Sequence, residues 1–239
     1  MPLPKIATPE YELVLPSTEK PVKYRPFLVK EEKLLLLALE SENSKQITQA
    51  IKSVLKSCIL TRNIKVEKLP TFDIEFLFLN IRARSVGEEV EVLIVAPDDG
   101  ETQIKITIDL EDIKVEKSED HQKTIKLDDT LFMDMKYPSL EQFISSNFDI
   151  NSNTDVDQSF ELIASCIDKI YNEEEVWDTD DVSKKEVVDF LNQMNSSQFK
   201  DIEKFFETMP KLSHTIEVTN PVTKVKSSVV LEGLSSFFV

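Results

Sequence analysis

The sequence predicts an α+β fold with N-terminal helices, a central antiparallel β-meander, C-terminal helices and a terminal β-hairpin. The evidence is the spacing of the apolar residues along the chain. It follows the 3.6-residue repeat of helices from about residue 30 to 86, the two-residue repeat of strands from 90 to 110, and the helical repeat again from 160 to 209. With 239 residues, 41% of them hydrophobic, the chain can form one large domain or two smaller ones.

The N-terminal segment is unusually rich in proline. Six of the 11 prolines lie in the first 26 residues. Because proline fixes φ and has no N–H group, it is disfavoured inside helices and sheets, so residues 1–29 are predicted to form an extended Pro-rich arm. The arm also carries apolar side chains, Leu13 and Tyr24 among them. Such an arm either packs back on the body or lies on a neighbouring molecule, and the sequence leaves both alternatives open.

Three helices are predicted after the arm. Residues 30–42 are strong helix formers and residues 44–60 place apolar side chains at helical spacing, so the two are expected to form an antiparallel pair. Pro70 interrupts the chain, and Thr71 can cap a third helix that ends near Gly87. Apolar residues cover more than one stripe of this third helix. It is therefore buried on several sides or shared with a partner.

The middle of the chain alternates apolar and polar residues. Residues 90–94 and 104–110 show this pattern on either side of the turn sequence Asp98-Asp99-Gly100, which predicts a β-hairpin. Short strands around 113–115 and 124–127 are expected to extend the hairpin into a meander of three or four strands with a polar outer face.

Helical spacing returns in the last third of the chain. A short helical piece is predicted after Ser139, followed by a polar linker at 150–157. Longer helices are predicted at 160–171, 182–194 and 198–209. Trp177 falls in an acidic loop, where it is either a hydrophobic plug or a docking residue.

The chain is predicted to end in a β-hairpin. Residues 214–218 and 225–231 flank the turn sequence Asn220-Pro221. The resulting organisation is an arm at 1–29, a helical plus β-meander domain at 30–150, and a C-terminal helical region with the terminal hairpin at 151–239.

Composition excludes several functional classes. The chain has only 3 glycines, whereas phosphate-binding loops need several close together. Its formal net charge of −16 opposes binding to nucleic acids and anionic lipids. The longest apolar run, residues 34–39, is far shorter than the roughly 20 residues that cross a bilayer. We therefore expect neither a nucleic-acid partner nor a membrane span.

The residues that usually carry chemistry do not form a recognisable motif. Cys58 and Cys166 lie in apolar helical contexts and are interpreted as buried small hydrophobes, while His121 and His214 have no second ligand at metal-binding spacing. No catalytic residue, cofactor or metal site is predicted.

Two rival functions remain, a cytosolic carboxylate hydrolase and a generic acidic protein that binds host factors, such as a mimic of DNA. A hydrolase would need an acidic pair with a raised pKa inside a cleft. The candidate acidic groups are Asp98-Asp99, Asp128-Asp129, Glu173-Glu174-Glu175 and Asp180-Asp181. A DNA mimic would need carboxylates at regular spacing, and these clusters are irregular.

Four stretches together carry a family resemblance. They are YRPFLVKEEK at 24–33, LPTFDIEFLF at 69–78 with IRARSVGE at 81–88, FFETMP at 205–210, and LEGLSSFF at 231–238. In this order and spacing they resemble the base plate protein family of T-even-type contractile-tail bacteriophages. The resemblance runs from about residue 20 to the end of the chain.

The resemblance implies a non-enzymatic protein of virion assembly, either a baseplate hub subunit or a hub-assembly protein that acts through protein–protein contacts. The alternative that it leaves open is a transient assembly chaperone, for example of the tape-measure protein, that is absent from the mature virion. Expected partners are other hub or tail proteins and the tape-measure protein, and a second copy of the chain is a further candidate. The expected location is the host cytoplasm during assembly and the tail baseplate for a structural subunit.

The two apolar ends of the chain are the predicted contact surfaces, together with the broad third helix. The residues singled out are Tyr24, Pro26 and Phe27 in the arm, and Phe237, Phe238 and Val239 in the tail. The reason is that apolar side chains at the extremities of an otherwise acidic chain favour burial against another surface.

Overall fold

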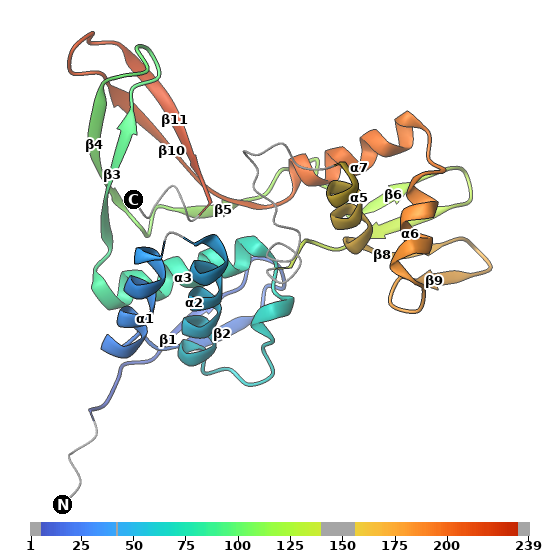
Figure 1. Ribbon diagram of the computed structural model, residues 1–239, viewed down its shortest axis with the longest axis horizontal. Coiled ribbons are helices and arrows are strands. Elements are labelled where there is room, and N and C mark those ends of the chain that lie inside the picture. The colour runs from blue at the N-terminus through green and yellow to red at the C-terminus, as the bar shows by residue number, and fades with distance from the viewer. Residues whose placement is uncertain (1–5, 42, 140–155, 234–239) are drawn as a thin grey trace, which may run out of the picture. The chain divides into compact units, whose positions relative to one another are not determined.

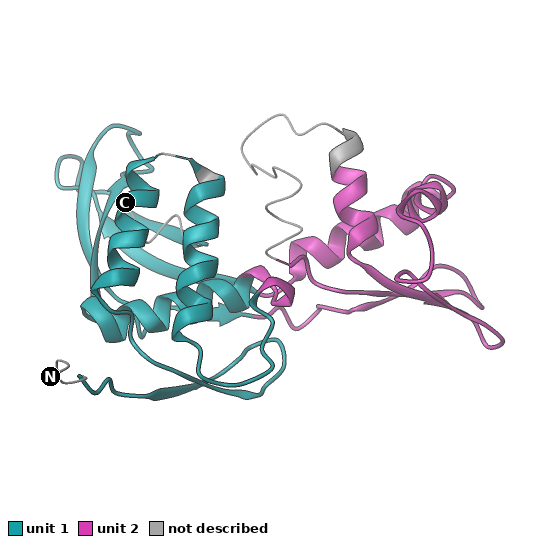
Figure 2. Ribbon diagram, turned by 60° about the horizontal axis from the view of Figure 1, so that its bottom comes forward, with its two compact units in different colours: residues 1–66, 72–116, 211–239 teal, residues 67–71, 117–210 magenta. Residues whose placement is uncertain are grey.

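The computed structural model describes residues 6–41, 43–139 and 156–233. It divides into two compact units, unit 1 with residues 1–66, 72–116 and 211–239, and unit 2 with residues 67–71 and 117–210 (Figures 1 and 2). Both units combine helices with antiparallel strands, in keeping with the predicted α+β class. The predicted segment boundaries at residues 29 and 150 stay predictions, since residue 150 lies outside the described residues.

Unit 1 contains three helices and seven strands in its described part. The helices are α1 (Val29–Glu40), α2 (Ser44–Cys58) and α3 (Thr71–Val86), with the short 3₁₀ helix η1 (Val66–Lys68) before α3. The strands are β1 (Tyr11–Val14), β2 (Pro21–Tyr24), β3 (Glu89–Val95), β4 (Gln103–Asp109), β5 (Lys114–Glu116), β10 (Lys211–Thr219) and β11 (Lys226–Glu232). All three helices lie within two or three residues of their predicted bounds.

Helix α3 forms the centre of unit 1. Eight of its 16 residues are buried, and they point in several directions around the helix axis. This confirms burial on several sides, the first of the two alternatives that its broad apolar coverage predicts. Its apolar side chains are therefore core rather than the exposed contact surface that the sequence suggested.

Two hairpins of unit 1 share one core. Strands β3 and β4 form a two-stranded sheet, and β10 pairs with β11 on one side and β5 on the other. Their inward-facing residues pack together with Leu79 and Ala83 of α3. This corrects the predicted meander, because β5 pairs with β10 rather than with β4, and the next strand belongs to unit 2. Alternation shows which side chains face a core, but not which strand is the neighbour.

The proline-rich segment forms a hairpin that packs back on unit 1. Strands β1 and β2 pair along their whole length, and Pro21 takes the first position of β2, where proline is tolerated. Leu15, Val22 and Tyr24 are buried. The Ser17 amide donates a 3.0 Å hydrogen bond to Oδ1 of Asp73, a fully buried carboxylate in the first turn of α3. The sequence left open whether the arm packs on its own body or on a neighbouring molecule. The buried residues and the Ser17–Asp73 contact show that this part of the arm packs on its own body.

In its described residues, unit 2 consists of a four-stranded antiparallel sheet in the order β6-β7-β8-β9 with three helices packed on it (Figure 1). The strands are β6 (Thr124–Lys126), β7 (Phe132–Met135), β8 (Ile167–Tyr171) and β9 (Val176–Asp178). The helices are α5 (Val156–Ser165), α6 (Lys184–Leu191) and α7 (Ser196–Thr208). Most of the predicted piece after Ser139 and of the linker at 150–157 lies outside the described residues.

The predicted helix at 160–171 is wrong in its second half, which is strand β8. The pairing of β7 with β8 is interrupted by a bulge, so that Met133 faces Ile170 and Met135 faces Ile167. An extra residue, Asp168, thus separates two isoleucines that bury into the same core. Their three-residue spacing imitates the repeat of a helix.

A buried amide joins the tips of the two hairpins of unit 1. Nδ2 of Asn220 donates hydrogen bonds to Oδ1 of Asp98 at 3.0 Å and to Oδ2 of Asp99 at 2.8 Å. Oδ1 of Asn220 accepts from the Val222 amide at 2.8 Å. Both polar atoms of the Asn220 side chain therefore have hydrogen-bond partners inside the protein, where the residue is only 1% exposed.

Replacement of this amide tests the tip contact. Asn220→Ala is expected to lower the free energy of unfolding by about 1.5 to 3 kcal/mol, because hydrogen bonds to two carboxylates are lost. Urea denaturation measures the change, with Asn192→Ala, an exposed asparagine after α6, as the matched control. Equal stability of the two variants would contradict the assignment.

Candidate functional site

Helix α1 exposes most of its apolar side chains. Only Glu31 and Ala38 are buried, and Leu35 is half-buried, so the helix rests on the body by one narrow stripe. The other apolar residues form what we call the leucine face, with side chains 40 to 79% exposed: Val29, Leu34, Leu36, Leu37 and Leu39. Five exposed apolar side chains on one short helix are unusual on a monomeric protein and indicate an interaction site.

The sequence explains why this face cannot be buried by one neighbour. Residues 34–37 are four consecutive leucines. At 100° per residue they spread around almost the whole helix circumference, whereas one neighbouring element covers about a third of it. Helix α2 lies antiparallel beside α1 (Figure 2). Its exposed side is instead polar and includes Gln49, Ser53 and Lys56.

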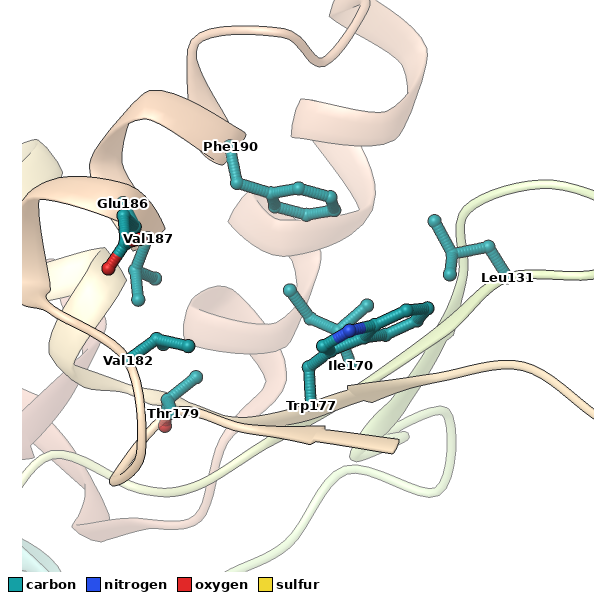
Figure 3. Close-up of a pocket in the computed structure, with 8 residues that line it drawn as sticks. All are labelled: Leu131, Ile170, Trp177, Thr179, Val182, Glu186, Val187 and Phe190. Atoms are coloured by element: carbon teal, nitrogen blue, oxygen red, sulfur yellow. The ribbon is translucent and has the colours of Figure 1, made fainter. Parts of the chain in front are cut away.

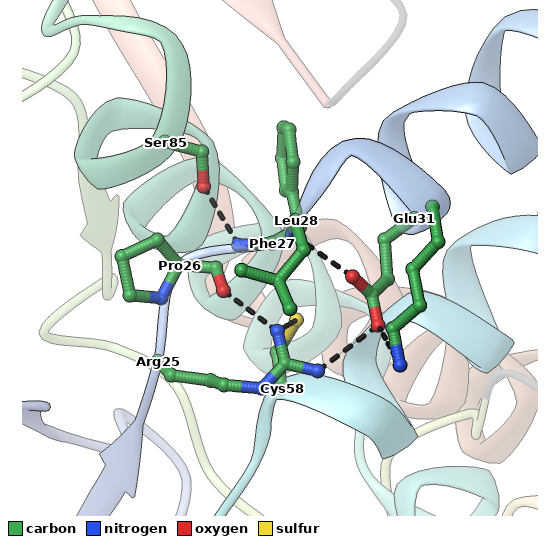
Figure 4. A network of polar contacts seen from close by, with 8 residues as sticks. Arg25, Pro26, Phe27, Leu28, Glu31, Cys58 and Ser85 are labelled. Atoms are coloured by element: carbon green, nitrogen blue, oxygen red, sulfur yellow. Dashed lines mark hydrogen bonds and ion pairs between the residues drawn. The ribbon is translucent and has the colours of Figure 1, made fainter. Parts of the chain in front are cut away.

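A buried ion pair fixes the start of α1 (Figure 4). Nη2 of Arg25 lies 2.9 Å from Oε1 of Glu31, and the side chains are only 13% and 4% exposed. Oε2 of Glu31 accepts from the Leu28 amide at 2.9 Å, which satisfies a free N–H at the helix start. Nη1 of Arg25 donates to the Pro26 carbonyl at 2.8 Å.

The same cluster connects α1 to the other two helices of unit 1. Nη1 of Arg25 lies 3.7 Å from Sγ of Cys58 at the end of α2, and the Phe27 amide donates to Oγ of Ser85 in α3 at 2.9 Å. Burial works to raise the pKa of Glu31, but hydrogen bonds from Arg25 and Leu28 outweigh it and hold this pKa below its ordinary value. Glu31 is therefore ionised at neutral pH.

The predicted contact residues occupy different environments. Tyr24 is 3% exposed and stacks on Tyr11, with ring centroids 5.8 Å apart, and Pro26 is buried. Phe27 is half-buried. Residues Phe237, Phe238 and Val239 lie outside the described residues. A partner contact by any of these six residues stays a prediction.

Unit 2 contains an apolar pocket of about 330 Å³ (Figure 3). Trp177 is one of its walls, in strand β9 rather than in the predicted loop, and Phe190 of α6 faces it across the hollow. The other lining residues are Leu131, Ile170, Thr179, Val182, Glu186 and Val187. The indole is 40% exposed, so it is not a fully buried plug.

The acidic groups that could have served a hydrolase all lie on exposed surface. Hydrogen bonds from Thr223 and Asn220 lower the pKa of Asp98, and the Thr130 amide lowers the pKa of Asp128. A general acid needs a raised pKa inside a cleft, so these groups do not form the hydrolase site considered above.

The histidine and cysteine side chains are engaged in packing. Nδ1 of His121 lies 3.0 Å from Oγ1 of Thr208 and Nε2 lies 3.0 Å from the Tyr137 hydroxyl, so both ring nitrogens have partners. Burial, followed by nearby lysines, lowers the pKa of His121. Burial raises the pKa of the Cys58 thiol to about 11 and that of Cys166 to about 12, far from the thiolate form that reacts.

The described residues contain neither a metal-binding cluster nor a helix suited to span a membrane. Within 6–41, 43–139 and 156–233, no three His, Cys, Asp or Glu side chains are grouped closely enough to hold a metal ion. Among the same residues, no helix combines the length and the apolar character that a membrane span requires.

Replacement of Glu31 tests the ion pair that fixes α1. Glu31→Gln is expected to lower the free energy of unfolding at pH 7 by about 1 to 3 kcal/mol, because Arg25 loses its charged acceptor. Since the pKa of Glu31 is lower in the folded protein, its stabilisation is present above the ordinary value of 4.5 and is lost as the pH falls through the folded value. The difference from the parent protein should therefore shrink in acid.

Urea denaturation at several pH values measures this effect. Glu32→Gln, an exposed neighbour in the same turn, is the matched control and should cost less than about 1 kcal/mol through the helix dipole alone. An equal loss in both variants, or a loss that is independent of pH, would contradict the role of the pair.

A comparison with known protein families matches nearly the whole sequence to one family. Residues 8–239 match the family described as T4 bacteriophage base plate protein. No curated protein and no solved structure gives a significant match to the chain. The match covers nearly the entire sequence and agrees with the resemblance carried by the four stretches above, and the chain therefore belongs to the T4 bacteriophage base plate protein family.

Proposed function

We propose that the chain is a non-enzymatic baseplate hub subunit or hub-assembly protein that binds another phage tail protein through the leucine face of α1. Membership of the baseplate family supports a protein that contacts other tail proteins. The observation that carries the proposal is the exposure of five apolar side chains on one 12-residue helix.

The energetics favour a bound state for this face. Full burial of a leucine or valine side chain contributes about 1.5 to 3 kcal/mol, and those on α1 are still 40 to 79% exposed. The helix itself is held in place before any partner arrives, because the Arg25–Glu31 pair fixes its first turn. Binding then requires little ordering of the backbone, which reduces its entropic cost.

A transient assembly chaperone, for example of the tape-measure protein, is the alternative. It would use the same face during assembly in the host cytoplasm and leave before the virion is complete. The two functions differ in one measurable quantity, the amount of the protein in purified virions. A structural subunit is present there in fixed stoichiometry, whereas a chaperone is absent.

Replacement of one exposed leucine tests the proposal. Leu36→Glu places a charge in the middle of the leucine face and is expected to reduce co-purification of tail proteins from infected cells by at least about tenfold, which corresponds to 1.4 kcal/mol. Glutamate is a good helix former and the position is exposed, so the fold should be retained.

Val222→Glu is the matched control, since Val222 is exposed on the turn between β10 and β11. Far-UV circular dichroism verifies the fold of both variants. Undiminished co-purification with Leu36→Glu would reject the leucine face as the contact.

Removal of Phe237, Phe238 and Val239 tests the predicted contact by the tail. We expect weaker association with hub partners and an unchanged far-UV spectrum, because the apolar area that these residues supply is lost while the helices and sheets remain. Normal co-purification of the truncated chain would refute a role for the tail.

A further inference from the structure

We infer that the pocket beside Trp177 binds an extended, basic segment of a partner protein, with one apolar side chain of that segment inserted into the pocket. The pocket belongs to unit 2 and lies outside the leucine face of α1. The inference therefore stands or falls independently of the contact proposed for α1.

The pocket suits one apolar side chain. Its volume of about 330 Å³ is at the lower end of the range of about 300 to 1,000 Å³ for ligand pockets. Its walls are mainly apolar, and Trp177 and Val182 are 40% and 37% exposed. Figure 3 shows the Phe190 ring and the Trp177 indole on opposite sides of the hollow, where an inserted side chain would contact both. Aromatic side chains that a partner covers on binding are typical of interface hot spots.

The charge around the pocket selects the partner. Residues 171–190, which supply six of the eight lining residues, carry 8 Asp and Glu against 2 Lys. The acidic side chains are all exposed: Glu173, Glu174, Glu175, Asp178, Asp180, Asp181, Glu186 and Asp189. Nζ of Lys184 is already 2.7 Å from Oε2 of Glu161. A rim of this sign attracts lysine and arginine and repels acidic peptides and nucleic acids.

The neighbouring strand favours an extended partner. Strand β9 is the last strand of the four-stranded sheet, and all three of its residues are exposed. Among the described residues it pairs only with β8, so its outer edge offers backbone groups to an added strand. Trp177 stands opposite Ile170 of β8, and both line the pocket. A segment laid along β9 therefore reaches the pocket with an alternate side chain.

Trp177 is the single tryptophan of the chain, so intrinsic fluorescence reports directly on this pocket. The probe is the capped peptide Lys-Val-Lys-Leu-Lys-Val-Lys, titrated into the full-length protein. We expect a saturable change of tryptophan emission that weakens as salt screens the acidic rim.

Two further capped peptides separate the contributions of charge and apolar insertion. Replacement of every lysine by glutamate, or of every valine and leucine by serine, should weaken binding by at least about tenfold. The variant Asp181→Lys should also weaken binding of the basic peptide. Glu217→Lys, the same charge change at an exposed site of unit 1, should not.

Several results would overturn the inference. No change of emission up to roughly 1 mM basic peptide, the weakest affinity relevant to a specific contact, would exclude the site. Equal binding of the serine peptide would show that attraction to the acidic surface alone is responsible. Equal binding of the glutamate peptide, or equal effects of the two protein variants, would exclude charge selection.

Discussion

The Arg25–Glu31 ion pair determines how α1 sits on unit 1. Because Glu31 accepts both from the guanidinium and from the Leu28 amide, the first turn of the helix cannot rotate without breaking a buried charged contact. The rotation of the helix about its axis is thereby set along its whole length. Glu31, Leu35 and Ala38 lie on the side of the helix that packs against the body. The remaining leucines are consequently held outward. An apolar surface that is fixed in place by a polar cluster beneath it is suited to binding a partner without prior rearrangement.

The two proposed binding surfaces differ in chemistry. The leucine face is helical and apolar, whereas the Trp177 pocket is hollow, includes a residue of the edge strand β9 and is lined mainly by a segment rich in exposed carboxylates. The parts of the chain that carry the two surfaces also differ in net charge. Residues 1–70 carry 12 Lys and Arg against 8 Asp and Glu, and residues 117–210 carry 9 Lys against 22 Asp and Glu. Such a chain can present different partners with different surfaces, as expected of a protein from a multi-component tail structure.

Much of the fold is predictable from local patterns, and the exceptions have physical causes. Helices α2, α3, α6 and α7 follow from apolar spacing, and α1 follows from its strong helix formers. The β3–β4 and β10–β11 hairpins follow from alternation and turn residues, whereas the β1–β2 hairpin was not predicted. Strand β8 is missed because a bulge at Asp168 separates Ile167 from Ile170 by a helical interval. The pairing of β5 with β10 joins residues about 100 positions apart, which no local pattern encodes. The candidate site could not be predicted from the sequence either. The leucine run predicts a helix, but the exposure of its side chains depends on how much of α1 packs against the rest of unit 1. Four adjacent leucines, which no single neighbour can bury, were the available signal.

Cross-linking mass spectrometry of tail assemblies from infected cells tests the central claim most directly. Lys30 and Lys33 are exposed on α1 beside the leucine face and provide reactive amines there. A protein that is held through this face should give cross-links from these two lysines to another tail protein, in assembly intermediates and, for a structural subunit, in virions as well. Cross-links from Lys30 and Lys33 only to the same chain, while lysines elsewhere on the protein link to tail partners, would contradict the account.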